Sequence, residues 1–291
     1  MTEPAPFTLI IPAHNEEAVI ARCLNTAIND APDGYPYEVI VAANGCTDNT
    51  VAAARRAAPE ATVLDIAEGS KTNAINKGLN SASYFPRIIL DADVECTHSS
   101  LAALAEALQQ PGIMTAAPAI RLKLDRCNWF IKAYYAAWMK QPYAKSGKGG
   151  AGCYGLSREA IDLAGPFPKI IGDDIWIHTR FADEQKCMVA QNSAGDPVFS
   201  IVHPPRTARQ QIKVEARRQI GNAEVKRDYP SPHFAALGQG GGWRKALSSG
   251  ASPVHLTVFY GMKVFARIEA RISQWRGRGS TWTRDLTSRE L

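Results

Sequence analysis

The sequence predicts an α/β protein with a mostly parallel central sheet, flanking helices and a C-terminal helical extension. In the first third of the chain, short apolar runs alternate with helical patterns. Each apolar run ends in a polar turn, whereas the last third of the chain carries two long helical patterns. Because neighbouring parallel strands need crossover helices, the alternation indicates a parallel sheet with both faces covered.

The expected elements of the first third follow one another in pairs. The strands cover 7–11, 37–43, 61–67 and 87–93. The helices cover 19–28, 49–58, 71–79 and 100–110. In such sheets ligands bind beyond the carboxyl ends of the strands. We therefore expect the chemistry directly after the apolar runs, where the chain carries Asn15, Asn44, Glu68 and Asp91.

The remainder of the chain has weaker patterns. A strand is expected over 114–122 and an aromatic-rich helix over 128–140, followed by a glycine-rich segment over 146–155. Two further helices are expected over 210–228 and 254–275, with a loop rich in proline and glycine between them.

Composition agrees with one large domain and an appendage. The chain has 291 residues, of which 45% are hydrophobic and 21% charged, so it can bury a core. We expect a catalytic domain over 1–205 and a basic helical extension over 206–291.

The six cysteines form no C-x-x-C pair, which disfavours a zinc site and a disulfide framework and suits a reducing cytosol. The N-terminus resembles no signal peptide, and no apolar run is long enough to span a bilayer.

The net charge of +5 is unevenly distributed. Lys and Arg concentrate in 206–227 and 263–291, and the rest of the chain is mildly acidic. This asymmetry favours an anionic partner, either phosphates or a membrane surface, and we expect no nucleic acid. A solvated basic face is the alternative.

Two carboxylates at the end of the fourth apolar run suggest a metal site. Asp91 and Asp93 form a D-x-D pattern. Mg²⁺ or Mn²⁺ prefers hard oxygen ligands and bridges one or two carboxylates to a substrate diphosphate. By neutralising charge on a departing diphosphate, such an ion lowers the barrier to breaking a sugar C1–O bond. A pair of surface carboxylates is the alternative interpretation.

Four segments in order resemble glycosyltransferase family 2. These are PAHNEE at 12–17, NGCTDNT at 44–50, SKTNAINKG at 70–78 and DAD at 91–93. The resemblance implies a Rossmann-like GT-A fold and an inverting, metal-dependent transfer from a nucleotide sugar. It implies metal contacts from Asp91, Asp93 and a downstream His203, for which a hydrogen-bonded histidine at a strand end is the alternative. It further implies nucleotide-sugar contacts from Pro12, Ala13, Asn15, Glu16, Asn44, Gly45, Asp48, Lys71, Asn76, Asp91 and Gly152.

Some positions depart from the family pattern. Ala43 and Asn44 stand where the family has aspartates, so we expect base recognition through amide hydrogen bonds, with uridine favoured. Ser70 replaces a glycine beside Lys71.

The acceptor side is expected at GDDIWIHTR, 172–180, which is similar to the family's E-D-x-x-L-x-x-R segment. Asp174 is the expected general base and Asp173 the acid beside it, since inversion needs one carboxylate to take the acceptor's proton. An N-cap pair opening a helix is the alternative. Arg206 and Arg209 can reach a diphosphate or lie on the surface.

The glycines around 149–157 resemble the family's sugar-pocket region. Gly147, Gly149 and Gly152 also spell G-x-G-x-x-G, but no strand precedes them, which disfavours a dehydrogenase. Polymerising synthases of this family carry a Q-x-x-R-W segment and several membrane helices. This sequence shows neither, so the resemblance favours transfer of a single sugar over processive synthesis. A nucleotidyltransferase and a catalytically silent sugar-binding or scaffold protein are the alternatives.

The last helical pattern is amphipathic and basic. It predicts an apolar side of Val254, Val258, Phe259, Met262, Phe265, Ile268 and Ile272, with Lys263, Arg267 and Arg271 opposite. Such a helix can lie on an anionic membrane, pack on its own domain or form a dimer. We expect a cytoplasmic protein, peripheral at the cytosolic face, with a glycan or lipid-linked acceptor as in surface polysaccharide assembly.

Overall fold

The computed structural model describes residues 4–141, 144, 151–234 and 242–276. Its first third forms the expected parallel sheet in the order β3-β2-β1-β4. These strands are β1 (Phe7–Ala13), β2 (Tyr37–Asn44), β3 (Thr62–Ile66) and β4 (Arg87–Leu90). Their crossover helices are α1 (Ile20–Ile28), α2 (Thr50–Ala57) and α3 (Lys71–Ser81). The α/β prediction is confirmed, and the sheet edge that carries the expected site residues is formed by consecutive strand ends.

The second part of the sheet is mixed, which the sequence pattern did not predict. Its strands are β5 (Glu95–Cys96), β6 (Thr115–Leu122), β7 (Cys153–Leu156), β8 (Lys186–Val189) and β9 (Phe199–Val202). β7 lies antiparallel between β4 and β6, and β9 pairs parallel with β6 and antiparallel with β5. The fourth strand ends at Leu90, so Asp91 and Asp93 lie in the turn that follows it.

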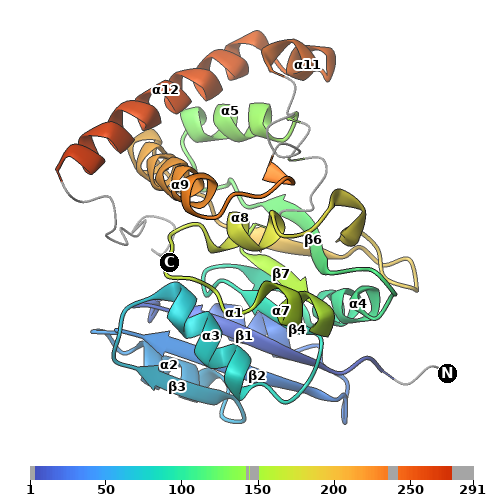
Figure 1. Ribbon diagram of the computed structural model, residues 1–291. Coiled ribbons are helices and arrows are strands. Elements are labelled where there is room, and N and C mark those ends of the chain that lie inside the picture. The colour runs from blue at the N-terminus through green and yellow to red at the C-terminus, as the bar shows by residue number, and fades with distance from the viewer. Residues whose placement is uncertain (1–3, 142–143, 145–150, 235–241, 277–291) are drawn as a thin grey trace.

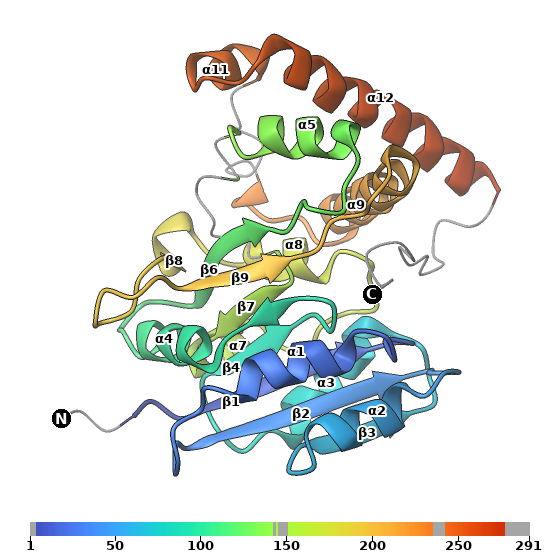
Figure 2. The same cartoon turned by 180° about the vertical axis from the view of Figure 1, so that it is seen from behind.

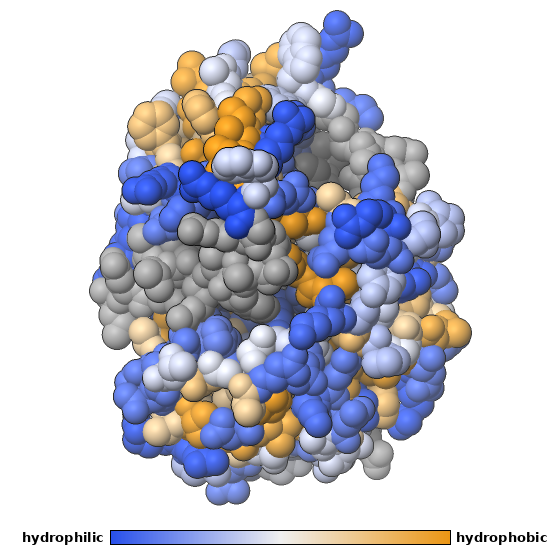
Figure 3. Space-filling view, turned by 60° about the vertical axis from the view of Figure 1, so that its left-hand side comes forward, coloured by the Kyte–Doolittle hydropathy of each residue, from blue (hydrophilic) through white to orange (hydrophobic). Residues whose placement is uncertain are grey.

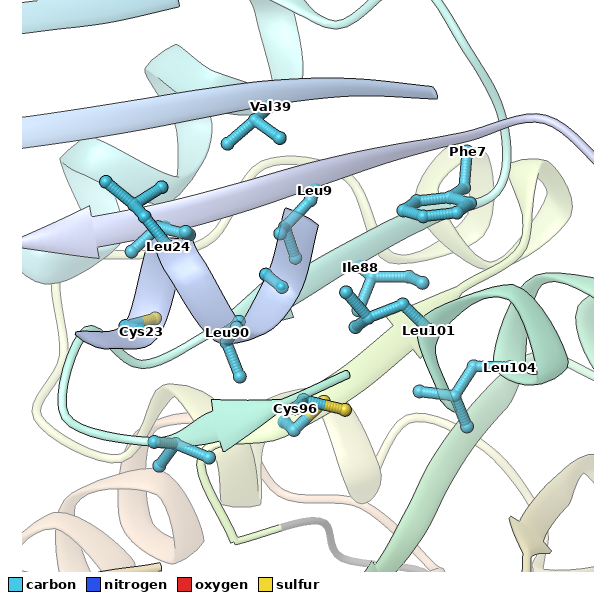
Figure 4. Close-up of a cluster of buried hydrophobic side chains, with 14 of the residues drawn as sticks. Phe7, Leu9, Cys23, Leu24, Val39, Ile88, Leu90, Cys96, Leu101 and Leu104 are labelled. Atoms are coloured by element: carbon cyan, nitrogen blue, oxygen red, sulfur yellow. The ribbon is translucent and has the colours of Figure 1, made fainter. Parts of the chain in front are cut away.

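Helices cover both faces of the sheet. On one face α1, α2 and α4 (His98–Leu108) pack over a cluster that includes Phe7, Leu9 and Leu104, as Figures 2 and 4 show. On the other face α3 packs with α7 (Arg158–Ala164) and α8 (Asp173–His178) over Ile10 and Ile89. Successive β1 residues therefore face opposite layers, as the alternation of side chains along a buried strand requires.

A separate layer of helices lies beyond the second part of the sheet (Figure 1). It contains α5 (Trp129–Trp138), α9 (Ala208–Asp228), α11 (Trp243–Ser248) and α12 (Pro253–Trp275). A core of its own, which includes Tyr134 and Phe259 with their rings 5.0 Å apart, holds α5 against α12. Since α5 comes from the first 205 residues, the layer is built from both proposed parts of the chain, and their division at residue 205 stays a prediction. No described helix is both long and apolar enough to cross a bilayer.

Candidate active site

The carboxyl ends of the parallel strands meet around two glycines. Gly45 follows β2 with φ of 55°, and its backbone N–H donates to the carbonyl of Ile66 at 2.7 Å. A Cβ atom at Gly45 would lie 2.7 Å from the Cα of Gly69. Both the positive φ and this close approach exclude a side chain at residue 45. The loops after β2 and β3 are thereby held in direct contact.

The loop after β1 is joined to the turn after β2 by side-chain hydrogen bonds. Asn15, at φ of 54°, accepts through Oδ1 from the backbone N–H groups of Thr47 at 2.6 Å and Asp48 at 3.3 Å. The Glu16 N–H donates to Thr50 Oγ1 at 2.7 Å. Asp48 in turn accepts from the Thr50 hydroxyl. The predicted nucleotide-binding residues Asn15 and Asp48 thus shape this loop pair.

Asn44 is buried beneath the same loops. Its Nδ2 donates to the carbonyls of Ala13 at 2.8 Å and Ala42 at 3.3 Å, while its own carbonyl contacts the His14 ring. The side chain is 3% exposed. The amide protons that the sequence suggested for base recognition therefore have partners within the protein.

Lys71 connects two carboxylates that lie far apart in the chain. It opens α3, whose N-cap Ser70 accepts from the Asn73 N–H at 3.3 Å. The Lys71 Nζ lies 2.8 Å from Asp91 Oδ1 and 3.0 Å from Asp173 Oδ2. Burial lowers the pKa of Lys71, but the charges of Asp173 and Asp91 outweigh it and raise that pKa. The ammonium therefore stays charged at neutral pH.

The predicted acceptor-side pair divides into a buried and an exposed acid. Asp173 is 4% exposed and accepts from the Tyr154 hydroxyl at 3.4 Å. Burial raises the pKa of Asp173 to about 6, against the opposing effect of Lys71. Asp174 is exposed and accepts from the Ile175 N–H at 2.7 Å. The two acids open α8, where carboxylates suit the helix dipole.

Gly152 lies directly against Asp91. It has φ of 75°, and its carbonyl accepts from the Asp91 N–H at 2.7 Å. A Cβ atom there would lie 2.8 Å from Val94 Cγ2 and 3.0 Å from Asp91 Oδ2. Only glycine fits this position without a shift, and the expected role of Gly152 near the sugar stays a prediction. Gly147 and Gly149 lie outside the described residues.

Contacts that the sequence did not reveal hold the segment 167–171, which precedes α8, in place. Asn76, which we expected at the nucleotide sugar, donates to the Phe167 carbonyl and accepts from the Phe167 N–H, both at 2.8 Å. Glu224 of α9 accepts from the Ile171 N–H at 3.0 Å. These pairs and the Tyr154 contact join distant segments, so no local pattern in the sequence could indicate them.

The proposed metal ligands lie around one end of the β5–β9 pair. Asp93 precedes β5 and His203 follows β9, and these strands are antiparallel. His203 Nε2 contacts Glu95, whose Oε1 lies 3.1 Å from Arg22 Nε. Within the described segments, no three His, Cys, Asp or Glu side chains form a group that could hold a metal. An ion shared with a diphosphate needs only one or two carboxylates, and carboxylate with imidazole is a donor set that Mn²⁺ accepts, so these residues fit such an ion.

A family profile and two solved structures agree with this fold. The family profile described as "Glycosyl transferase family 2" matches residues 8–155. A mannosyltransferase from Pyrobaculum calidifontis, solved with GDP-Man and Mn²⁺, has 21% identity and a TM-score of 0.64, covering 94% of this chain and 87% of that one. Glucosyl-3-phosphoglycerate synthase from Mycobacterium tuberculosis, solved with Mn²⁺, uridine-diphosphate-glucose and glycerol 3-phosphate, has 18% identity and a TM-score of 0.55, with coverage of 76% and 79%. No curated protein sequence matches the chain. At these identities the likeness to solved structures shows the GT-A fold.

Proposed function

The chain belongs to glycosyltransferase family 2, and we propose that it moves a single sugar from a nucleoside diphosphate sugar to an acceptor hydroxyl with inversion at the anomeric carbon. The observation that carries this proposal is the position of Lys71 between Asp91 and Asp173. One of these acids follows the donor-side strand β4, and the other opens the acceptor-side helix α8. An inverting transfer needs donor and acceptor groups on opposite sides of one carbon, and Lys71 contacts one acid from each of the sides that we assign to them.

On the donor side, we assign the diphosphate to the N-terminus of α3 and to Lys71. Backbone N–H groups at a helix N-terminus and a buried ammonium both stabilise phosphate oxygens. Asp93, with Asp91 and His203, is the proposed ligand set for Mn²⁺ or Mg²⁺. When bound, the ion would neutralise charge on the leaving diphosphate. Because Gly152 has no side chain, its backbone lies directly against Asp91, and we assign the sugar to the side of these carboxylates.

On the acceptor side, we assign the general base to Asp174. Its exposure lets it meet an incoming hydroxyl, whereas Asp173 is buried and paired with Lys71. Asp173 would then act as a positioning residue that fixes the start of α8. Proton removal by a placed carboxylate assists attack of the acceptor oxygen on C1. The acceptor we propose is a glycan or a lipid-linked glycan, as in surface polysaccharide assembly at the cytosolic face of the cell membrane.

The nucleotide base is proposed to be uracil, held by the loops after β1 and β2. The two solved relatives divide on this point, because one was solved with a guanosine and the other with a uridine donor. Because the Asn44 amide protons have internal partners, base contacts would come from backbone groups of these loops and not from that amide.

The proposed donor chemistry can be tested by thermal shift. UDP, GDP and their sugar conjugates are added with Mn²⁺, with Mg²⁺ or with EDTA, since a ligand that binds the folded state raises its melting temperature. We expect a metal-dependent shift with UDP that is lost in Asp93→Ala, while that variant melts normally without ligand. A shift with GDP but not with UDP would indicate that the base is guanine and not uracil. A shift that persists in EDTA would contradict the metal site. Hydrolysis of the donor by the wild-type chain would exclude the silent scaffold, and pyrophosphate release would indicate a nucleotidyltransferase.

A further inference from the structure

The last helix has two apolar faces, and one of them is exposed. Leu256, Phe259 and Met262 of α12 are buried in the core that it shares with α5. Ala266 and Ala270 pack against α9 in the same way. Lys263, on this inner side, reaches the buried Glu215 of α9 at 2.7 Å. The helix is therefore held in place through residues on one side only.

The opposite side of α12 carries an exposed apolar stripe. From Phe265 onward its members follow one another by three, four and three residues, which keeps these side chains on one face of a helix. Phe265 is 61% exposed, Ile268 49% and Trp275 87%. The exposed members of the stripe are Val254, Phe265, Ile268, Ile272 and Trp275. Val258 is half-buried and packs against the core shared with α5. Our sequence projection assigned Phe259 and Met262 to the same side, but they belong to the buried face.

Exposed arginines border the stripe. Arg267 and Arg271 follow one another by one helical turn along its edge, and Arg276 stands at its C-terminal end. Glu269 is the acidic side chain of α12, and it is half-buried. Figure 3 shows hydrophobic surface mixed with strongly hydrophilic residues on the upper part of the molecule, where Figure 1 shows the helical layer. The surface thus combines apolar side chains with positive charge.

We propose that this face of α12 docks on an anionic lipid bilayer with the helix lying in the plane of the headgroups. A helix of 23 residues is about 34 Å long, so the stripe forms an extended line of contact instead of a pocket. Apolar side chains on one face enter the acyl boundary, while bordering arginines meet lipid phosphates. Trp275, at the end of the stripe, has the amphipathic ring that suits this boundary.

Charge favours lipid over a second copy of the chain as the occupant. Two copies pairing through this face would bring two basic helices together, and like charges across an interface oppose association. Anionic headgroups neutralise the same arginines. α12 follows the proposed active-site residues in the chain, and liposome binding needs no substrate, so membrane docking can fail while the proposed function holds.

The test is flotation of the full-length chain with liposomes of phosphatidylcholine alone or mixed with phosphatidylglycerol. We expect binding to the anionic liposomes that weakens from low to physiological salt, and little binding to the neutral ones. Phe265→Asp with Ile268→Asp should reduce anionic binding by more than about tenfold, because it places charges at the acyl boundary. Arg267→Gln with Arg271→Gln should reduce it by about tenfold or more at low salt.

A matched control is Leu163→Asp in α7, where an exposed apolar side chain outside the stripe receives the same charge. It should bind liposomes as the wild type does. Since the changed side chains are exposed, every variant should keep its melting temperature, and truncation before α12 is avoided because it would remove the packed inner face. The proposal would be overturned if the wild type did not bind liposomes or if the Phe265/Ile268 variant bound them equally well. It would also be overturned if analytical ultracentrifugation showed a wild-type dimer that is a monomer in this variant.

Discussion

The half of the molecule that contains β1 to β4, called the donor half after its proposed role, and the helical layer are stabilised in different ways. In the donor half, loops after neighbouring strands are joined by short hydrogen bonds such as those of Asn15 to the turn at Thr47. In the helical layer, α5, α9 and α12 are held by a shared core and by one buried acid, Glu215. The first arrangement requires particular residues at particular loop positions, so it leaves sequence motifs. The second requires complementary side chains from distant segments, and it leaves only amphipathic patterns.

The largest effect is expected where the two regions meet, at the start of α8. Asp174→Asn should lower kcat by about 10² to 10⁴-fold, because it removes the proposed general base while keeping the side chain's shape. Donor affinity should stay unchanged if donor binding belongs to the other half. Steady-state kinetics and calorimetric titration of the nucleotide measure the two quantities. A matching loss of donor affinity would assign Asp174 to donor binding and would contradict its separation from the donor half.

In the helical layer, Glu215→Ala should lower the free energy of unfolding by about 3 kcal/mol or more, because it leaves the half-buried Lys263 without its carboxylate. Urea denaturation measures this change. Arg218→Gln is the matched control, since this guanidinium contacts the same acid but its side chain is 41% exposed. That control should cost under about 1 kcal/mol. Similar losses in both variants would mean that the layer does not depend on one buried acid.

Acid should weaken the helical layer through the same residue. Burial opposes ionisation of Glu215, but Arg218 and Lys263 outweigh it and lower its pKa to about 2. Because the folded pKa lies below the unfolded one, its stabilisation is present above about pH 4.5 and is lost as pH falls toward about 2. It amounts to at most about 3 kcal/mol.

The measurement for this acid effect is the pH dependence of unfolding free energy in the wild type minus that in Glu215→Gln. The subtraction is needed because Asp173 has the opposite effect on the pH dependence of stability. Its folded pKa is raised to about 6, so its contribution to stability grows as pH falls from about 6 toward its ordinary pKa. Burial also lowers the pKa of Lys263, so the pair contributes less at neutral pH than Glu215 alone would suggest. A difference that stays constant from pH 5 to pH 2.5 would contradict the prediction.

The smallest expected effect belongs to the donor side, where single positions are tightly fitted. Gly152→Ala should destabilise the fold by about 1 to 3 kcal/mol more than Gly165→Ala does. Both glycines have positive φ, at 75° and 69°, so they share the cost of strain. A Cβ atom at residue 152 meets Val94 and Asp91, whereas one at residue 165 meets nothing within 4 Å. Equal melting temperatures of the two variants would show that Val94 and Asp91 move aside at little cost.

The donor half could be predicted from the sequence because its signals are local. The alternation of strands and helices indicated β1 to β4, and the residues after each strand lie at one sheet edge as expected. The antiparallel insertion of β7 could not be predicted, since its four residues follow a glycine-rich segment without an alternating pattern.

Pairings between distant segments also escaped prediction. The contact of Lys71 with Asp173 joins residues that no local pattern connects, although both were expected in the site. For α12, the projection identified an amphipathic helix but could not tell which apolar residues find partners within the protein. That assignment depends on where α5 and α9 lie, which only the tertiary structure shows.

The contact between Gly172 and Gly221 limits how the helical layer can move. A Cβ atom at Gly172 would lie 3.3 Å from the backbone of Gly221, in the middle of α9, and one at Gly221 would lie 3.1 Å from the Gly172 nitrogen. Glycine at both positions lets the backbone of α9 approach the loop that starts α8, and a side chain at either residue would push the two segments apart. Because Asp173 and Asp174 directly follow Gly172, any displacement of α9 at this contact would also move the start of α8 and both carboxylates.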